Sequence, residues 1–325
     1  MNDFVPRIPL PVTEVRDRLE AAGHTAVLAG GCVRDLWLGL DPEDHDIATS
    51  ALPSEVAMLF PRTLPTGLGH GTVTVHWKGM AVEITTFRSE SGYSDSRRPD
   101  RVEFGVALEH DLARRDFTCN AMAWSPALGL VDPFDGRGDL ADRCLRTVGV
   151  ARDRFGEDAL RLLRAIRFAC RLDLRPTPDL LAAAAGTAGS LARISRERVT
   201  EEWRRIVRSP HPGRLVDFAG TGVASASFPG LPVPVDDVRL CRLLADWLRP
   251  GIPEAVALAA LADAAGTASP SGRPDAVSPD DLSLRVPVRL HAAMAGIRTA
   301  QGLWEADAGP GADPDSSSRR IAAFL

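Results

Sequence analysis

Residues 25–50 read TAVLAGGCVRDLWLGLDPEDHDIATS, and this stretch indicates the fold of the first part of the chain. Residues 25–29 form a short apolar run, typical of a buried strand, that leads directly into Gly30 and Gly31. A helix is expected at about residues 33–38. A strand, two glycines and a helix start can bind a phosphate, because the backbone approaches closely and free N–H groups face the anion. Many such turns bind nothing, so the motif alone leaves both interpretations open.

Asp44 and Asp46 follow this turn, and a second strand is expected around residues 46–48. Residues i and i+2 of a strand point to the same face, so the two carboxylates would lie close together and repel each other. A cation between them would relieve that repulsion, and oxygen ligands suit Mg²⁺. The alternative is a polar turn, since Asp-Pro-Glu precedes them, but the phosphate-type turn upstream favours the metal.

Residues 72–77 and 81–87 are predicted to form a hairpin. Glu83 lies in its second strand among apolar neighbours, either as a surface residue or as a third acid facing the metal site. The polar stretch 89–101 contains Gly and Pro and is predicted to be a mobile loop.

A cluster of charges follows at Arg114, Arg115 and Asp116. One arginine could reach a triphosphate while Asp116 holds its neighbour in place. The alternative is a salt bridge at a helix start, which contributes little to stability.

From about residue 153 the pattern becomes helical, with helices expected at residues 157–171, 178–185 and 195–207. On the first of these, every third residue is charged, at Asp158, Arg161, Arg164 and Arg167. These four wind over one half of the helix, and the apolar residues between them fall on the other half. Three successive arginines favour a binding surface over an ordinary solvated face, which usually mixes charges of both signs.

The composition is that of a globular protein. The chain has 325 residues, of which 45% are hydrophobic and 25% charged; this length suggests roughly two domains. No run of 18 apolar residues occurs, so no membrane-spanning helix and no membrane partner are expected. The N-terminus lacks the pattern of a secretory signal, and five cysteines without a CxxC favour reduced, mostly buried thiols and a cytoplasmic location.

The charge is unevenly distributed. The net charge is −5, but residues 151–214 hold 14 Arg against 8 Asp and Glu, a net +6, which leaves −11 elsewhere. Lys78 is the only lysine. Arginine suits bidentate contacts with phosphate, although a GC-rich genome would also produce arginine in place of lysine.

Six stretches together carry a resemblance to a known family. They are GGCVRDLWLGLDPEDHDIATS, VEITTFR, DLARRDFTCNAMAW, DPFDG, EDALRLLRAIRF and ISRERV. In this order and spacing, over more than half of the chain, they resemble the bacterial class of tRNA nucleotidyltransferases (CCA-adding enzymes) and the related poly(A) polymerases.

The resemblance implies an α+β fold. A polymerase-beta-like nucleotidyltransferase head with a mixed sheet would occupy residues 1–148. An all-helical part would follow, with a neck carrying the base-selecting helix at residues 149–210. A shortened and partly disordered body or tail is expected at residues 211–325, with disorder at residues 267–279 and 308–318.

The resemblance also implies a role for each candidate residue. Asp44 and Asp46 would be Mg²⁺ ligands, with Glu83 as the third catalytic carboxylate. Gly31 and Arg34 would hold the incoming triphosphate, and Arg115 would contact the nucleotide. Asp158 and Arg161 would read the base edge by hydrogen bonds, and two further arginines would assist in nucleotide binding and in holding the helix: Arg164 and Arg167.

The implied reaction is the addition of CCA, or of the terminal A alone, to the tRNA 3′ end from CTP and ATP. The loop at residues 89–99 looks intact, which argues against a relative that adds only the two C residues. A poly(A) polymerase would be expected to have a basic C-terminal region, which this chain lacks. A non-catalytic RNA- or nucleotide-binding relative is the third alternative, disfavoured because both metal carboxylates are present.

Overall fold

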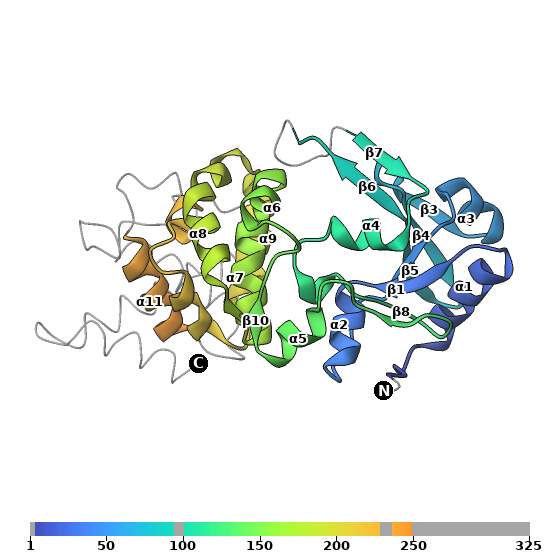
Figure 1. Ribbon diagram of the computed structural model, residues 1–325, viewed down its shortest axis with the longest axis horizontal. Helices are drawn as coiled ribbons and strands as arrows, with labels where there is room; N and C mark the ends of the chain where they lie inside the picture. The colour runs from blue at the N-terminus through green and yellow to red at the C-terminus, as the bar shows by residue number, and fades with distance from the viewer. Residues whose placement is uncertain (1–3, 94–100, 228–235, 249–325) are drawn as a thin grey trace, which may run out of the picture. The chain divides into compact units, whose positions relative to one another are not determined.

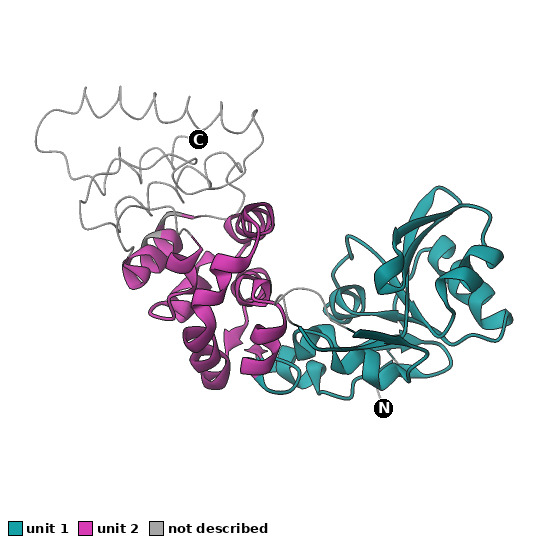
Figure 2. Cartoon of the chain, turned by 90° about the horizontal axis from the view of Figure 1, so that it is seen from above, with its two compact units in different colours: residues 1–142, 146–150 teal, residues 143–145, 151–325 magenta. Residues whose placement is uncertain are grey.

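The computed structural model describes residues 4–93, 101–227 and 236–248. The chain divides into two compact units, residues 1–142 with 146–150 and residues 143–145 with 151–325 (Figure 2). The two segments predicted to be disordered lie outside the described residues. Among the helices that the structure describes, none has both the length and the apolar character needed to cross a membrane.

A seven-stranded sheet forms the centre of the first unit, in the order β3-β4-β5-β2-β1-β8-β9 (Figure 1). Neighbouring strands are antiparallel except for β2 and β5, which run parallel. The strands are β1 (Ala26–Ala29), β2 (Asp46–Thr49), β3 (Thr63–Gly67), β4 (Thr72–Trp77), β5 (Met80–Thr86), β8 (Ala123–Ser125) and β9 (Gly129–Val131). The predicted first strand, second strand and hairpin are confirmed, whereas β3, β8 and β9 carry no clear sequence pattern.

Strand β1 lies inside this sheet between β2 and β8, and all four of its residues are fully buried. A strand covered on both faces has no polar positions, which explains its unbroken apolar sequence. The helices of the unit are α1 (Leu10–Ala21), α2 (Gly31–Trp37), α3 (Pro53–Leu59), α4 (Leu108–Ala113) and α5 (Gly136–Ala141). Helix α2 begins two residues earlier than predicted, directly at the second glycine.

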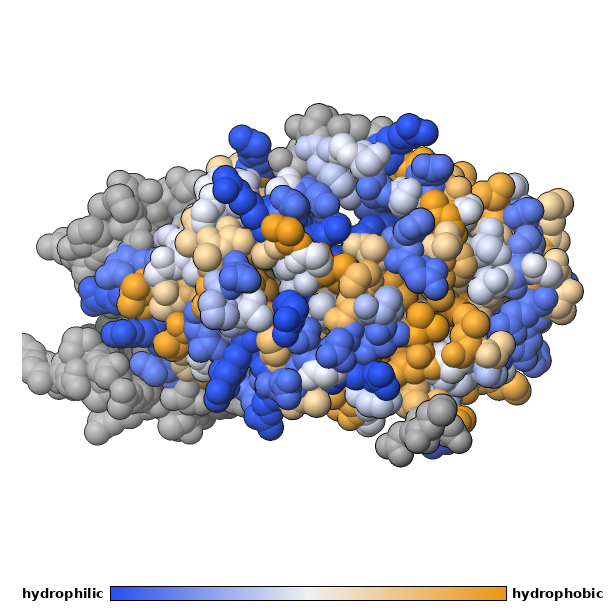
Figure 3. Space-filling model, in the orientation of Figure 1, coloured by the Kyte–Doolittle hydropathy of each residue, from blue (hydrophilic) through white to orange (hydrophobic). Residues whose placement is uncertain are grey.

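Apolar side chains gather over β1 and β8 on the face drawn in Figure 3. Aromatic rings also pack in this unit: Phe4 lies edge-on against Trp37 and Trp124, with ring centroids 5.1 and 6.5 Å apart. The indole N–H of Trp124 donates to the backbone carbonyl of Phe4 at 3.0 Å. These contacts hold the N-terminal segment against the sheet.

A second hairpin stands beside the main sheet. Strands β6 (Arg88–Ser91) and β7 (Arg101–Phe104) pair antiparallel. The prediction of a loop over residues 89–101 is therefore wrong at both ends, because polar side chains do not prevent a two-stranded ladder that is open to solvent on one side. Residues 92 and 93 are in no strand, as predicted, and residues 94–100 lie outside the described residues.

The second unit is mainly helical. Its helices are α6 (Ala151–Glu157), α7 (Leu160–Leu172), α8 (Pro178–Thr187), α9 (Arg196–Val207), α10 (Val223–Ala226) and α11 (Asp237–Trp247), with 3₁₀ turns η3 (Ala188–Arg193) and η4 (Pro212–Phe218). Helix α7 is buried around most of its circumference and packs against α9 and η4. The unit is not entirely helical, since two-residue strands β10 (Cys144–Leu145) and β11 (Arg175–Pro176) pair in parallel.

Candidate active site

The acidic residues lie at the start of β2 and beside it on β5. Asp46 is the first residue of β2 and pairs in register with Glu83, because the two strands run parallel. Directly paired residues of neighbouring strands extend from the same face of a sheet. The register therefore brings Glu83 next to Asp46. From the sequence alone, Glu83 could have been either a surface residue or a third acid facing the metal site.

These carboxylates hinder one another's ionisation. Burial, together with the neighbouring Glu83 and Asp44 carboxylates, raises the pKa of Asp46 to about 6, although Arg115 opposes the shift. Burial and Asp44 likewise raise the pKa of Glu83, against the effect of Arg88. A bound divalent cation would relieve this repulsion, and three carboxylates are the oxygen donors that such an ion prefers.

Asp44 reaches this group from outside the strand. Strand β2 begins only at Asp46. The expectation that residues 44 and 46 share one face of the same strand is therefore wrong. Pro42 has no N–H to donate to a ladder, and the segment before β2 stays irregular and leaves Asp44 exposed. Within the described ranges, no three acidic, His or Cys side chains are close enough together to hold a metal as they stand.

The glycine turn lies between β1 and α2. Gly30 has a φ of +87°, in the left-handed region that a residue with a side chain rarely adopts. A Cβ at this position would also collide with the guanidinium of Arg115. Glycine therefore suits residue 30 for its backbone conformation, and its lack of a side chain leaves room for the guanidinium of Arg115.

Arg34 lies inside the unit and is only 2% exposed. Its Nε donates to Asp35 at 2.8 Å, and its Nη1 donates to the side chain of Asn120. These bonds link α2 to the segment that follows the two arginines. The predicted contact of Arg34 with a triphosphate stays a prediction; the contacts seen here hold the turn together.

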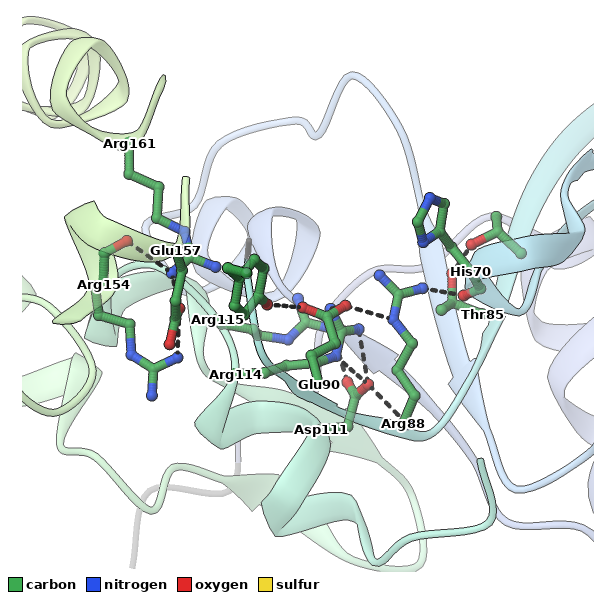
Figure 4. A network of polar contacts seen from close by, with 12 residues as sticks. His70, Thr85, Arg88, Glu90, Asp111, Arg114, Arg115, Arg154, Glu157 and Arg161 are labelled. Atoms are coloured by element: carbon green, nitrogen blue, oxygen red, sulfur yellow. Dashed lines mark hydrogen bonds and ion pairs between the residues drawn. The ribbon is translucent and has the colours of Figure 1, made fainter. Parts of the chain in front are cut away.

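Arg115 and Arg114 share the carboxylate of Asp111 (Figure 4). Arg114 donates to it at 2.8 Å and Arg115 at 3.3 Å. Asp116 accepts from the side chain of Asn120 at 3.0 Å and from the backbone N–H of Phe117. The expectation that Asp116 holds one of the arginines in place stays a prediction.

Asp158 lies in the second unit, between α6 and α7, and the prediction of one helix over residues 157–171 is wrong at this point. Its Oδ1 accepts from the backbone N–H of Leu160, the first residue of α7, at 3.0 Å. Its Oδ2 accepts from Arg198 of α9 at 2.8 Å. The bond of the Asp158 side chain to the backbone two residues on is an alternative to helical bonding, which accounts for the break.

Arg161 contacts Glu157, and its Nη1 donates to the backbone carbonyl of Arg154 at 3.1 Å (Figure 4). Arg164 is half-buried, with its guanidinium 5.4 Å from the ring centroid of Phe168. Both arginines remain partly accessible, as a nucleotide-binding role requires.

Arg167 differs from the other two arginines. It is 5% exposed, and its Nε donates to Glu202 of α9 at 2.7 Å. The prediction of three successive arginines on an open polar face is wrong here, because α9 packs against α7 and covers the third one. Arg167 thus joins α7 to α9. Its contacts are those expected for holding the helix, and its role in nucleotide binding stays a prediction.

Comparison with known proteins relates this geometry to a family. Residues 26–146 match the model of the poly A polymerase head domain, and residues 173–233 match that of a probable RNA and SrmB-binding site of polymerase A. The crystal structure of the Bacillus stearothermophilus CCA-adding enzyme in complex with CTP superposes with a TM-score of 0.76. It is 37% identical, over 91% of this chain and 71% of that one.

The chain belongs to the family of the CCA-adding enzymes. The family assignment confirms the predicted α+β fold with a nucleotidyltransferase head. Members of this family generally use a divalent metal ion.

Two curated CCA-adding enzymes show how far the similarity extends. That of Lactiplantibacillus plantarum is 50% identical over 196 residues, which are 60% of this chain and 48% of the relative. That of Geobacillus stearothermophilus is 44% identical over 223 residues, covering 69% of this chain and 55% of the relative. The chain thus spans about half the length of the curated relatives it matches.

A more distant solved structure shares the fold. It is a tRNA nucleotidyltransferase complexed with a primer tRNA and an ATP analogue, is 21% identical, and has a TM-score of 0.67 over 95% of this chain and 91% of that one.

Sequence reasoning did not identify three residues that hold the predicted site residues. Asp111 binds Arg115, Asn120 binds Arg34, and Arg198 binds Asp158. All three lie within the family motifs quoted above. The i,i+4 spacing of Asp111 and Arg115 was a signal that could have identified their pair. The other two pairs join segments 86 and 40 residues apart, which only the tertiary structure brings together.

Proposed function

We propose that this chain is a tRNA nucleotidyltransferase that adds CCA, or the terminal A alone, to tRNA 3′ ends from CTP and ATP. The observation that carries the proposal is the parallel pairing of β2 with β5, which brings Glu83 beside Asp46 in a member of this family. Relatives with the same fold are described in complex with CTP, with an ATP analogue and primer tRNA, and with tRNA. We also propose that the enzyme acts in the cytoplasm.

The reaction is a nucleotidyl transfer, in which the tRNA 3′-hydroxyl attacks the α-phosphate of the triphosphate and pyrophosphate leaves. Asp44 and Asp46 would hold the divalent metal, which we propose to be Mg²⁺, with Glu83 beside them. When bound, the ion would stabilise the charge on the attacking and leaving oxygens. The raised pKa values of Asp46 and Glu83 support this assignment, because burial and the neighbouring carboxylates both disfavour the ionised forms and a bound cation would favour them.

Positively charged and backbone groups would bind the triphosphate. Gly31 begins α2, where backbone N–H groups lack helical partners, and Arg34 supports the same turn. Arg115 would contact the phosphates, and its Nε is buried without a hydrogen-bond partner among the described residues. An anionic oxygen would satisfy that donor. Nucleotidyl transfer needs such positioning and charge neutralisation more than covalent catalysis.

The base would be read in the second unit by Asp158 and Arg161, with Arg164 and Arg167 supporting the nucleotide and the helix. A carboxylate accepts and a guanidinium donates, so the pair can match the hydrogen-bonding edge of C or A. A wrong base would leave buried groups unpaired and would be rejected. We propose the domain limits accordingly: head 1–148, neck 149–210, and body or tail 211–325.

The test uses three tRNA substrates that end before CCA, after C and after CC. Each is incubated with the purified chain, Mg²⁺ and labelled CTP or ATP. Ordered addition of C, C and A would establish a complete CCA-adding enzyme, and A added only to the CC-ended tRNA would make it an A-adding enzyme. Repeated A addition to other RNAs would identify a poly(A) polymerase. No incorporation would leave a non-catalytic binding relative and contradict the proposal.

Chelation tests whether nucleotide incorporation needs a divalent metal ion. EDTA is expected to remove all incorporation, and added Mg²⁺ to restore it. Incorporation that persists after exhaustive chelation would contradict the metal role of Asp44 and Asp46.

A further inference from the structure

Asp111 is a buried carboxylate to which the proposed mechanism assigns no role. It lies on α4, and its side chain is 1% exposed. A buried carboxylate is costly unless hydrogen-bond donors and positive charges surround it. The identity of those donors therefore indicates the purpose of the residue.

The two oxygens of Asp111 serve different partners (Figure 4). Oδ1 accepts from the guanidinium of Arg114 at 2.8 and 3.0 Å, and from the backbone N–H of Arg88 at 3.4 Å. Oδ2 accepts from Nη2 of Arg115 at 3.3 Å. One carboxylate thus joins β6 to both arginines of the motif.

The two arginines depend on Asp111 to different degrees. Arg114 is also held by Glu90 of β6, whose Oε1 lies 3.2 Å from its Nη1. Among the described residues, Asp111 is the only carboxylate in an ion pair with Arg115. The other hydrogen bond of the Arg115 guanidinium is a long one, 3.5 Å, to the backbone carbonyl of Asn120.

We propose that Asp111 is a positioning residue for nucleotide binding: it holds the Arg115 guanidinium over the side-chain-free face of Gly30, ready for the triphosphate. The inference rests on the proposed function and deepens it. The space above Gly30 is open to the guanidinium only because no Cβ is present. Without the carboxylate, the guanidinium would be free to leave that position, and the charge aimed at the phosphates would be lost.

The experiment is a double-mutant cycle on CTP binding. Asp111→Asn keeps the shape of the side chain but removes its charge and one acceptor. In the otherwise native chain we expect CTP affinity and kcat/KM for incorporation to fall about tenfold, as for other residues that orient a binding group. In an Arg115→Ala background we expect the same change to have less than about a twofold effect, because the group that it orients is gone.

Glu90→Gln is the matched control. It removes a carboxylate of the same network that contacts Arg88, Arg114 and Tyr93. We expect both Glu90→Gln and Asp111→Asn to lower the thermal unfolding midpoint, but Glu90→Gln to change CTP affinity less than about threefold because Glu90 does not contact Arg115. If Asp111→Asn fails to fold, Asp111→Glu displaces the carboxylate by one methylene and should weaken CTP binding only when Arg115 is present.

An equal loss of affinity in both backgrounds would overturn the positioning role, as would unchanged CTP affinity in the native background. A native chain that binds CTP but incorporates nothing contradicts the proposed function, while the binding cycle still decides the role of Asp111. A native chain that binds no CTP overturns both.

Discussion

At the scale of single residues, Asp46 has an energetic cost that its proposed role explains. Burial and the neighbouring Glu83 carboxylate raise its pKa from 3.8 to about 6. A carboxyl group with a raised pKa in the folded state destabilises the fold wherever it is ionised, which includes neutral pH. A residue retained at such a position is typical of a functional site, because an uncharged side chain would suit the fold better.

We therefore predict opposite effects of Asp46→Asn on stability and on activity. In metal-free protein near neutral pH, the free energy of unfolding should rise by about 1 kcal/mol, because the repelled charge is gone. Incorporation should fall by at least about a thousandfold through loss of the metal ligand. Urea unfolding and labelled-nucleotide incorporation measure the two effects.

Asp41→Asn is the control for this substitution, since Asp41 is an exposed acid five residues away. It should change stability by less than about 0.5 kcal/mol and keep the activity. A destabilised Asp46→Asn protein, or one with substantial activity, would contradict the prediction.

At the scale of elements, Glu90 connects the β6–β7 hairpin to α4. Burial alone would raise the pKa of this carboxyl, but Arg114, the Tyr93 hydroxyl and Arg88 outweigh burial and hold the pKa below its ordinary value. The ionised form is thus stabilised by folding. The contribution is fully present above the ordinary value of 4.5 and is lost as the pH falls through the lower folded-state pKa.

We predict that Glu90→Gln lowers the free energy of unfolding at pH 7 by about 1 kcal/mol, the usual magnitude for a hydrogen bond to a charged group. The difference from the native chain should shrink as the pH falls below 4.5. Urea unfolding at a series of pH values measures it. Glu103→Gln, an exposed acid on β7, should show no comparable difference at any pH. If the difference in the free energy of unfolding between the native chain and Glu90→Gln instead grew as the pH fell, the predicted direction of the Glu90 pKa shift would be wrong.

Helices α7 and α9 are joined by the Arg167–Glu202 pair, in which each side chain is 6% exposed. Breaking such a pair leaves an uncompensated buried charge. We predict that Glu202→Ala lowers the free energy of unfolding by about 3 kcal/mol. The double substitution Arg167→Met and Glu202→Leu should recover most of that loss, because it removes both charges together. Thermal and urea unfolding measure both variants.

Glu201→Ala is the matched control on α9. Glu201 pairs with Arg204 and Arg205, but its side chain is 44% exposed, so its loss should cost less than about 1 kcal/mol. If Glu201→Ala and Glu202→Ala lowered the free energy of unfolding equally, burial would not be the reason for the large effect of Glu202→Ala.

At the scale of the whole molecule, the candidate residues divide between the two units. The acidic residues and Arg115 belong to the first unit, and Asp158 and Arg161 belong to the second. If the first unit supplies the chemistry and the second selects the base, variants in the two units should fail in different ways.

We predict that Asp158→Ala combined with Arg161→Ala loosens base choice while incorporation continues. The ratio of C and A incorporation to U and G incorporation should fall by about tenfold or more, because lost hydrogen bonds no longer penalise a wrong base. Incorporation of each labelled triphosphate on the three tRNA substrates measures this ratio. Unchanged selectivity in the double variant would contradict the base-reading role.

Much of the first unit was predictable from sequence, because its signals are local. The apolar run before Gly30 is buried on both faces as β1, and the glycines follow it directly into α2. The hairpin β4–β5 forms as predicted because alternating residues and a Lys-Gly turn specify it over a short span. The ordered motifs also identified the family before any contact was known.

Only the tertiary structure decided which residues meet. Asp46 and Glu83 are 37 positions apart, and no local pattern encodes the parallel pairing that brings them together. Helical periodicity placed Arg167 on the polar half of α7, but the packing of α9 buries it against Glu202. The bond from the backbone N–H of Arg88 to Asp111 likewise depends on the approach of β6 to α4, whereas Asp111 meets Arg114 and Arg115 locally, three and four residues further along the chain. Residue types and spacing thus determine the local chemistry, whereas pairing across the chain depends on contacts between distant segments that no local signal specifies.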